Sequence, residues 1–396
     1  MKKFLSVALC LALLAGFFTA AHAEGGSPLA FRNGEFKILV LSDTQDDHHP
    51  AADMLNLISR SIEAEKPDLI IFTGDLVEDN RFGISFADDE PLREGVVVRN
   101  DAEKTYDNVV KASDAVLSVF QESGIPFAIA QGNNDHKVDM TNAQWLDLYS
   151  RYSNNLTCDM SEDEEGRIDY NLMINTSGGE PAFNLWLMDT GRHGISEESI
   201  SWYREKSAEI TRDNGGEPVP AFVFQHIQVP DVGNLFEECS PFDEGARGKG
   251  GKFYRLNKDI SRGTPFYAWT PCEPSEEFTA WKEQGDVIGA YFGHQHVEGF
   301  TGTVDGIELG FTYGSEFAKT GPYGYRVITL KEDDIRNYEN DVYTYEGSVK
   351  NGDWRFEKED GRGYTEYANP VMKYLSYAKN FAWSAVTTII ALFADT

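Results

Sequence analysis

The sequence predicts an α/β fold with a parallel β-sheet at its core. Short apolar runs, each followed by polar residues, alternate with stretches whose apolar residues recur at helical spacing. Successive strand–helix units of this kind form parallel strands joined by right-handed crossovers. Towards the end of the chain, alternating strands separated by glycine turns predict antiparallel strands that complete the fold.

The first part of the chain contains the clearest strand–helix units. Strands are predicted at 36–41, 68–72 and 126–130, and amphipathic helices at 51–64 and 105–121. Residues 81–100 between them are mixed and charged, which predicts a surface excursion.

The second part continues with more widely spaced elements. Residues 231–275 are rich in glycine, proline and charge, and predict a long functional loop rather than a core element. The remaining predictions are strands at 170–174, 183–188, 221–224, 287–292, 299–303, 307–312 and 325–330, and helices at 200–210 and 277–283.

The two ends of the chain differ from this main domain, which we place at 24–332. Residues 1–23 combine two lysines, an apolar core and a small-x-small cleavage site, and so predict a signal peptide and export to the periplasm or the outside of the cell. Residues 333–396 are predicted to form a C-terminal extension of strand and helix, for which docking on the domain is one arrangement. Its apolar segment 381–393 is shorter than a membrane span, so a docked helix is favoured over membrane association.

Composition limits the partners. The formal net charge of −30 argues against a nucleic-acid duplex, because phosphate backbones are bound by basic surfaces. A metal-dependent enzyme tolerates such acidity, since bound cations reverse the local field. Outside the leader the cysteines are Cys158, Cys239 and Cys272; in an exported protein Cys239 and Cys272 are the preferred disulfide pair. Oligomeric state is left open.

Polar side chains follow the ends of several predicted strands. The carboxyl ends of strands in a doubly wound sheet meet at one edge, so residues distant in sequence can share a pocket there. Taken singly, each of these residues could be a helix cap, a turn or a buried histidine; together they combine carboxylate, amide and imidazole ligands suited to Mn, Fe or Zn. They are Asp43, Asp75, Asn133, His226, His294 and His296.

In this order, the motifs resemble those of the calcineurin-like metallophosphoesterases, and most closely their purple-acid-phosphatase-related branch. The resemblance covers about residues 36–330, and it implies a four-layer fold in which two mixed β-sheets pack face to face between α-helices. The motifs are Ser42-Asp43-Thr44-Gln45, Gly74-Asp75, Gly132-Asn133-Asn134-Asp135, Gln225-His226 and Gly293-His294-Gln295-His296.

The resemblance also implies the ligands of a dinuclear centre holding two divalent or trivalent metal ions. Asp43, Gln45 and His296 would hold the first ion, Asp75 would bridge, and the second ion would be held by Asn133, His226 and His294. The implied reaction is hydrolysis of a small phosphomonoester or phosphodiester through attack by a metal-activated hydroxide.

Two positions depart from the family pattern. Gln45 and Asn134 stand where the family usually has histidines. Asn134 is a candidate catalytic residue, since an asparagine can donate a hydrogen bond to a developing oxyanion, but it cannot deliver a proton. His136 is a candidate replacement for the missing acid beside Asn134. These departures keep open an alternative, a catalytically weakened binding protein with the same fold.

A glycine-rich, locally basic stretch at 244–252 offers candidate contacts to substrate phosphate. Arg247 and Lys249 are the residues we predict for this role, with a solvated flexible loop as the alternative.

Overall fold

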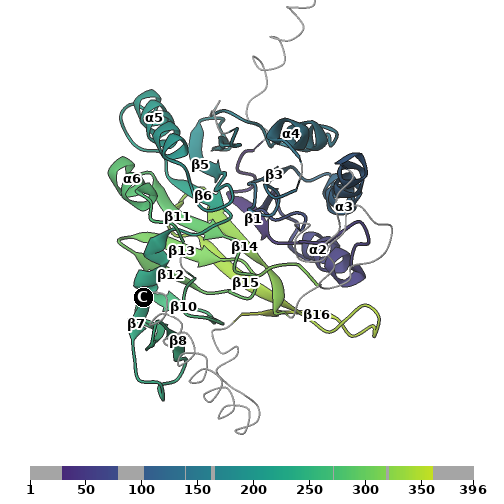
Figure 1. The fold of residues 1–396 in the computed structure, drawn as a ribbon. Helices are drawn as coiled ribbons and strands as arrows, with labels where there is room; N and C mark the ends of the chain where they lie inside the picture. The colour runs from purple at the N-terminus through teal and green to yellow at the C-terminus, as the bar shows by residue number, and fades with distance from the viewer. Residues whose placement is uncertain are drawn as a thin grey trace, which may run out of the picture.

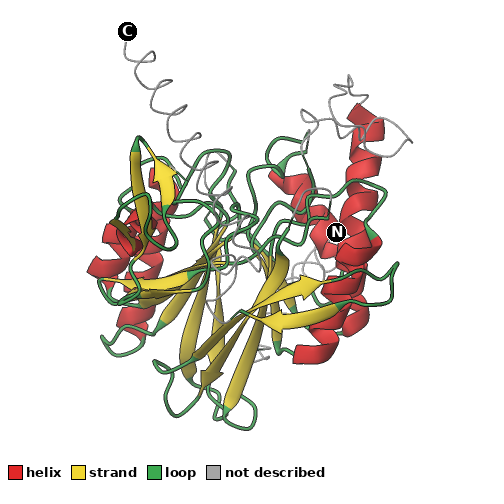
Figure 2. Ribbon diagram, turned by 90° about the horizontal axis from the view of Figure 1, so that it is seen from below, coloured by secondary structure: helices red, strands yellow, loops and turns green. Residues whose placement is uncertain are grey.

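The computed structural model describes residues 29–78, 102–138, 140–161, 166–270, 272–317 and 321–359. Two large mixed sheets lie face to face at the centre, and helices cover their outer sides (Figure 1, Figure 2). Apolar side chains from both sheets share one buried cluster, including Ile38 and Leu41 from one sheet and Phe222 and Phe224 from the other. The predicted four-layer α/β fold is therefore confirmed.

One large sheet has six strands in the order β16-β15-β14-β1-β2-β3. The strands β1, β2 and β3 run parallel, as the sequence predicts, and β14 pairs antiparallel with β1. The last two strands extend this sheet from the region that follows residue 332. The strands are β1 (Glu35–Leu41), β2 (Leu69–Phe72), β3 (Phe127–Ile129), β14 (Tyr323–Lys331), β15 (Glu339–Glu346) and β16 (Arg355–Lys358).

The other large sheet has seven strands in the order β10-β12-β13-β11-β6-β5-β4. Its centre is parallel, from β5 through β6 and β11 to β13, and its edges are antiparallel. The strands are β4 (Tyr170–Asn175), β5 (Pro181–Met188), β6 (Ala221–Gln225), β10 (Ser261–Arg262), β11 (Val287–Phe292), β12 (Thr301–Val304) and β13 (Ile307–Phe311).

The helices divide between the two outer faces (Figure 1). On the side of the six-stranded sheet lie α2 (Ala52–Glu65), α3 (Ala102–Ser123) and α4 (Asn142–Ser150). On the side of the seven-stranded sheet lie α5 (Glu197–Asp213) and α6 (Glu277–Gln284). The sequence prediction missed α4, although Thr141 and Gln144 form a capping box that marks its start.

The prediction of one long loop at 231–275 is wrong. This region contains a short helix, η2 (Pro230–Leu235), and a separate three-stranded sheet in the order β7-β9-β8. The strands are β7 (Phe236–Glu238), β8 (Arg247–Lys249) and β9 (Lys252–Leu256). Between β8 and β9, Gly250 and Gly251 both have positive φ angles, of 56° and 77°, as a two-residue hairpin turn requires. The Gly-Gly pair is thus the local sequence signal for this hairpin.

The predicted disulfide between Cys239 and Cys272 is also wrong, because both are free thiols, as is Cys158. Cys239 follows β7 and its N–H donates to Phe253 O within the small sheet. Cys272 lies in the segment before α6. Burial raises the pKa of both thiols, that of Cys272 to about 11. Cys239 is thus hydrogen-bonded to the small sheet, whereas Cys272 lies in a separate segment of the chain.

Some predictions fall outside the described residues: the signal peptide at 1–23, the excursion at 81–100 and the apolar segment 381–393. Among the helices that the structure describes, none combines the length and the apolar character that a bilayer span needs.

A fully buried arginine joins the two large sheets. Arg326 on β14 donates to Phe311 O on β13, and its Nη1 also donates to Thr301 Oγ1 at 3.1 Å on β12. Its guanidinium carbon lies 5.1 Å from the ring centroid of Tyr291 on β11. The side chain thus extends from the six-stranded sheet and donates hydrogen bonds to acceptors on the seven-stranded sheet.

We expect Arg326→Ala to lower the free energy of unfolding by about 3 kcal/mol, because it leaves a cavity and unpaired buried acceptors. Urea denaturation measures this change. Arg204→Ala removes an exposed ion pair with Glu283 and should cost less than about 0.5 kcal/mol. Equal losses in the two variants would contradict the bridging role of Arg326.

Candidate metal centre

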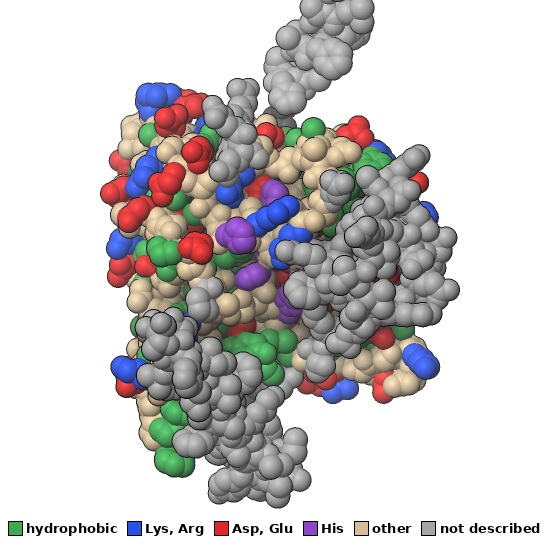
Figure 3. All heavy atoms as spheres, in the orientation of Figure 1, with side chains coloured by type: hydrophobic (Ala, Val, Ile, Leu, Met, Phe, Trp, Pro, Cys, Tyr) green, Lys and Arg blue, Asp and Glu red, His purple; other side chains and the backbone are tan. Residues whose placement is uncertain are grey.

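The predicted metal ligands meet where the two large sheets abut. Asp43, Asp75 and Asn133 follow β1, β2 and β3, whereas His226 and His294 follow β6 and β11. Backbone contacts hold the two sets together: His294 N donates to Asp43 Oδ2 at 3.0 Å, and Nδ1 of His226 lies 2.8 Å from Thr73 O. Figure 3 shows histidines gathered near the middle of this face, with Lys and Arg side chains beside them. The site is therefore built at the junction of the sheets.

Two groups of potential metal ligands share one carboxylate. Asp75, His226 and His294 form one group, and Asp43, Asp75 and His296 form the other; within each, the ligand atoms lie within 4.8 Å of one another. Nε2 of His226 is 3.1 Å from Asp75 Oδ2, and Nε2 of His296 is 3.4 Å from Asp43 Oδ1. Asp75 thus lies where a ligand shared by two ions would lie.

The donor set fits two cations. Nδ1 of His226 faces a backbone carbonyl and Nδ1 of His296 faces the Glu316 carboxylate, so Nε2 of each ring points into the site. The Asn133 amide oxygen lies 3.0 Å from Nε2 of His226, so one cation could bind both atoms once the imidazole is neutral. Carboxylate, amide and imidazole donors are the ligands that Mn, Fe and Zn accept.

The charges of the site are strongly coupled. Burial opposes ionisation of Asp75, but the charge of His226 and its hydrogen bond prevail and lower the pKa of Asp75. Burial also opposes a charged His226, yet Asp75 and Asp43 raise its pKa to about 9. Burial and the charge of His226 lower the pKa of His294 to about 3. Because a ligating imidazole must be neutral, metal binding would release a proton from His226.

The backbone of the site is held in a conformation that side chains rarely adopt. Asp43, Gln45, Asp75 and His294 all have positive φ angles, of 50°, 36°, 58° and 68°. Such strain collects at functional sites, where the surrounding structure imposes it. Gly132 allows the close approach: a Cβ there would lie 2.1 Å from Asp75 N. These turns aim the ligands at one point at a cost in backbone energy.

The two amides that replace histidines both contact Asp75. Gln45 Nε2 donates to Asp75 Oδ2, so its amide presents nitrogen rather than oxygen to the shared carboxylate. Asn134 donates to Asp75 twice, from its main-chain N at 2.7 Å and from Nδ2 at 2.8 Å. The Asn134 carbonyl accepts from Lys137 Nζ at 2.7 Å. Asn134 therefore holds Asp75, and at most one of its amide hydrogens is available to a substrate.

His136 is oriented by a buried carboxylate. Its Nε2 lies 2.6 Å from Oδ1 of Asp189, and its side chain is 17% exposed. Burial would lower the pKa of His136, but the charge of Asp189 outweighs burial and raises it. Conversely, burial favours a protonated Asp189, and the charge of His136 lowers its pKa. The pair forms a charged contact beside the metal ligands.

Arg247 and Lys249 lie on β8 of the small sheet. Arg247 donates to Phe266 O at 2.9 Å and to Ala246 O at 3.1 Å. Lys249 donates to Trp269 O and its Nζ lies 4.0 Å from the centroid of the Trp269 ring. Desolvation lowers the pKa of Lys249 to about 8. Both cationic groups thus contact main-chain carbonyls of segments beside the small sheet.

Two further residues support the site, and the sequence analysis assigned no role to either. Asp135 accepts the N–H groups of Asp75 and Leu76 at 3.0 Å each and that of Gly132 at 2.9 Å, which ties the second motif to the third. Glu316 orients His296. Asp135 ends the motif that contains the predicted ligand Asn133, which is a local signal for a role in the site, but Glu316 lies twenty positions beyond His296 and carries no motif.

Asp47, His48 and His49 form another group whose potential ligand atoms lie within 4.8 Å of one another. They begin two positions after Gln45 in the chain. The Asp47 carboxylate accepts the N–H of His49 at 2.6 Å, and the two histidine rings are 4.1 Å apart.

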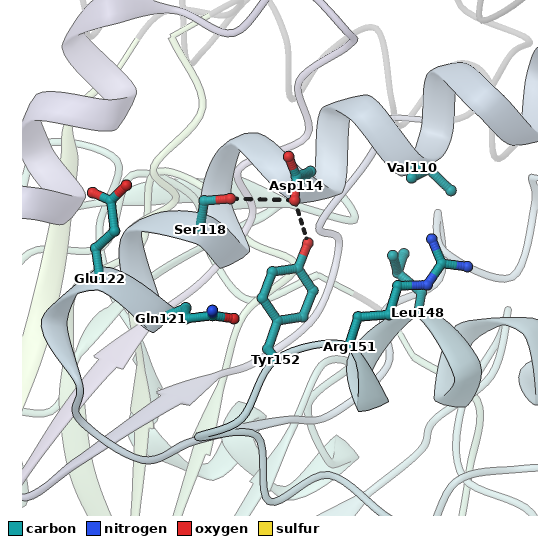
Figure 4. Close-up of a pocket in the computed structure, with 8 residues that line it drawn as sticks. All are labelled: Val110, Asp114, Ser118, Gln121, Glu122, Leu148, Arg151 and Tyr152. Carbon is teal, nitrogen blue, oxygen red and sulfur yellow. Dashed lines mark hydrogen bonds between the residues drawn. The ribbon is translucent and has the colours of Figure 1, made fainter.

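A separate pocket of about 300 Å³ lies between α3 and α4 (Figure 4). Asp114 accepts hydrogen bonds there from Ser118 at 3.2 Å and from Tyr152 at 2.7 Å. None of the predicted metal ligands lines this pocket, so it is distinct from the metal centre. Its lining is Val110, Asp114, Ser118, Gln121, Glu122, Leu148, Arg151 and Tyr152.

Fold and site together define a class of protein: a four-layer α/β protein with two candidate metal-ligand groups that share a carboxylate at the strand ends. Comparison with known families agrees. The calcineurin-like phosphoesterase profile matches residues 36–298, and the chain belongs to that family.

The similar curated proteins are plant members of the purple-acid-phosphatase group. Probable inactive purple acid phosphatase 14 of Arabidopsis thaliana is 27% identical over 368 residues, which cover 81% of this chain and 80% of that protein. Probable inactive purple acid phosphatase 29 of the same plant is 24% identical over 334 residues, covering 74% and 75%.

Solved structures show more distant similarity. A dimetal phosphatase from Danio rerio aligns with a TM-score of 0.47 and 13% identity, covering 78% of this chain and 95% of that one. A PhoD structure aligns with a TM-score of 0.48 and 10% identity, covering 91% and 79%.

We expect Glu316→Gln to weaken metal binding at the Asp43–His296 position about tenfold to hundredfold, because the carboxylate fixes the His296 ring. Competition with a chelator measures the affinity for Mn²⁺ or Zn²⁺. Glu339→Gln alters only a surface ion pair with Lys331 and serves as the control. Unchanged affinity in Glu316→Gln would remove Glu316 from the site.

We expect the contact of His136 with Asp189 to stabilise the fold in a defined pH range. Because folding raises the pKa of His136, the contact stabilises the folded state fully at pH values below the ordinary pKa of 6.5. This stabilisation is lost as the pH rises through the pKa of His136 in the folded state. The lowered Asp189 pKa keeps its contribution until the pH falls below 3.8. The contact is therefore strongest between these two values.

His136→Gln should accordingly cost about 2 kcal/mol of unfolding free energy at pH 5.5 and clearly less at pH 9. Denaturant titrations at both pH values, with metal content matched, make the comparison. His193→Gln, at an exposed histidine nearby, should show no such difference. A larger cost at pH 9 than at pH 5.5 would refute the assignment.

Proposed function

We propose that this protein hydrolyses a small phosphate ester at a dinuclear metal centre. The observation that carries the proposal is the position of Asp75, whose carboxylate belongs to both ligand groups. A single buried carboxylate shared by two such groups suits the two-ion arrangement used in phosphate displacement. The family membership of the chain supports the same reaction class.

In this proposal Asp43 and His296 would hold one ion, and Asn133, His226 and His294 would hold the other. Gln45 would join the first set only through its amide oxygen, which requires its amide to turn away from Asp75. When bound, the two cations would activate a water molecule and neutralise charge on the phosphate. The chain's own contribution is orientation. Thr73 and Glu316 direct the His226 and His296 rings, and Asp135 fixes the backbone on either side of Asp75.

The proposed substrate carries a good leaving group. Asn134 has no proton to give, and Nε2 of His136 is already engaged by Asp189. An ester whose alcohol leaves as a stable anion, such as an aryl phosphate, needs little protonation. His136 remains the proposed acid for other esters, and Arg247 and Lys249 remain proposed contacts to substrate from the small sheet. We also propose that residues 1–23 direct export.

A second candidate is a binding protein with the same fold and little or no turnover. Gln45 and Asn134 favour it, because each supplies an amide where the family usually has an imidazole. The similar Arabidopsis proteins are named probable inactive phosphatases, which favours the same candidate.

We expect purified protein supplied with Mn²⁺ to bind two ions and to hydrolyse 4-nitrophenyl phosphate. Asp75→Asn should lower kcat/KM about a thousandfold or more and reduce the metal content, because a neutral amide cannot bridge two cations. Elemental analysis and the release of 4-nitrophenol provide the two readouts.

The matched control is Asp147→Asn, which alters an exposed pair with Arg151 on α4 and should leave both readouts unchanged. Metal binding without turnover in the parent protein would favour the binding-protein candidate. Turnover that survives Asp75→Asn would exclude a centre built around Asp75.

A further inference from the structure

One cation of the described chain reaches the amides beside the shared carboxylate. Lys137 lies on the turn that follows β3, and its Nζ is 2.7 Å from Asn134 Oδ1. The other end of the same amide donates to Asp75 Oδ2 at 2.8 Å. The ammonium group is therefore separated from the proposed bridging carboxylate by a single amide group.

Lys137 also lies against a predicted metal ligand. The atom of the Asn133 amide that points away from the histidines is 2.6 Å from Lys137 Nζ. With its oxygen turned towards Lys137, Asn133 would accept from the ammonium and donate to His294 and His226; with its oxygen turned inward, it can ligate a metal. The same oxygen cannot do both.

The orientation of the Asn133 amide affects Lys137 when metal ions are bound. If the Asn133 oxygen holds a metal ion, its NH₂ group faces the Lys137 ammonium, and two donors then oppose each other at close range. Lys137 would relieve that contact by turning an N–H bond towards another acceptor. A phosphate bound to the two ions would supply such acceptor oxygens beside Asn134.

The turn that carries Lys137 is held firmly. Lys137 N donates to Asn134 O at 2.9 Å, and the preceding residue, His136, is engaged by Asp189. Arg192 also donates to His136 O, at 2.9 Å from Nε and 2.6 Å from Nη2. The ammonium is thus presented from a pre-ordered segment, which reduces the entropy lost on binding an anion.

We propose that the Lys137 ammonium binds the phosphate group of the substrate directly and supplies the positive charge that Asn134 lacks. The inference rests on the proposed function for the location of the phosphate. It assigns Lys137, rather than Asn134, as the donor to the phosphate oxygens, and it explains how a centre with two amide replacements in a chain of net charge −30 could retain an anion.

The test measures the binding of inorganic phosphate to the full chain loaded with Mn²⁺ by isothermal titration calorimetry. Lys137→Met removes the charge, Lys137→Gln keeps a hydrogen-bond donor without charge, and Lys137→Arg keeps the charge. Lys206→Met is the matched control, because Lys206 is a partly buried lysine paired with Glu209 on α5.

We expect Lys137→Met and Lys137→Gln to raise the phosphate Kd about tenfold to hundredfold, the effect of losing one charged hydrogen bond. Lys137→Arg should stay within about threefold of the parent, and Lys206→Met should not change it. Phosphate affinity within about twofold of the parent in both neutral variants, at equal metal content, would overturn the proposal. Loss of metal from both neutral variants would also overturn it, because Lys137 would then act by holding the ligands.

Two measurements, phosphate affinity and ester hydrolysis, distinguish failure of the Lys137 inference from failure of the hydrolase proposal. If phosphate binding depends on Lys137 but the parent does not hydrolyse 4-nitrophenyl phosphate, the hydrolase proposal fails and this inference stands. If the parent hydrolyses the ester and its phosphate affinity does not depend on Lys137, the inference fails and the hydrolase proposal stands.

Discussion

A single buried carboxylate, that of Asp75, is the constraint on which the site depends. An ionised carboxylate away from water is unfavourable unless it is hydrogen-bonded or paired with charge. Here it accepts from the main-chain and side-chain nitrogens of Asn134 and from Gln45, and it lies 3.1 Å from His226 Nε2. The strained turns after β1, β2 and β11, and the absence of a Cβ at Gly132, all serve to bring these groups around it.

The two amide replacements change how this carboxylate is held. Both Gln45 and Asn134 point a donor at Asp75, so they restrain its position but contribute neither an imidazole ligand nor an acid. Positive charge returns to the site from the following turn, where Lys137 contacts Asn134 and His136 pairs with Asp189. The cationic groups beside this motif thus come from the two residues that follow Asp135 in the chain, His136 and Lys137.

Much of the fold could be predicted because buried strands and helices have characteristic local patterns of apolar residues. The strands β1, β2, β6 and β11 are short apolar runs, and α2 and α3 show helical spacing of apolar residues. The errors arose where local signals were weak or overlooked: α4 is short, and the Gly250-Gly251 turn lies inside a region of loop-like composition. The Cys239–Cys272 pairing failed because nothing local records which thiols tertiary packing brings together.

The sequence by itself determined the residue types at the strand ends, and with them the family and the metal-ligand chemistry. Only the tertiary structure decided which side chains support those ligands, because contacts such as Glu316 with His296 and Asp189 with His136 join distant elements. It also decided the direction of the Asn134 amide, which lies between Asp75 and Lys137. An amide has a donor end and an acceptor end, and only its neighbours in space determine which end faces the site.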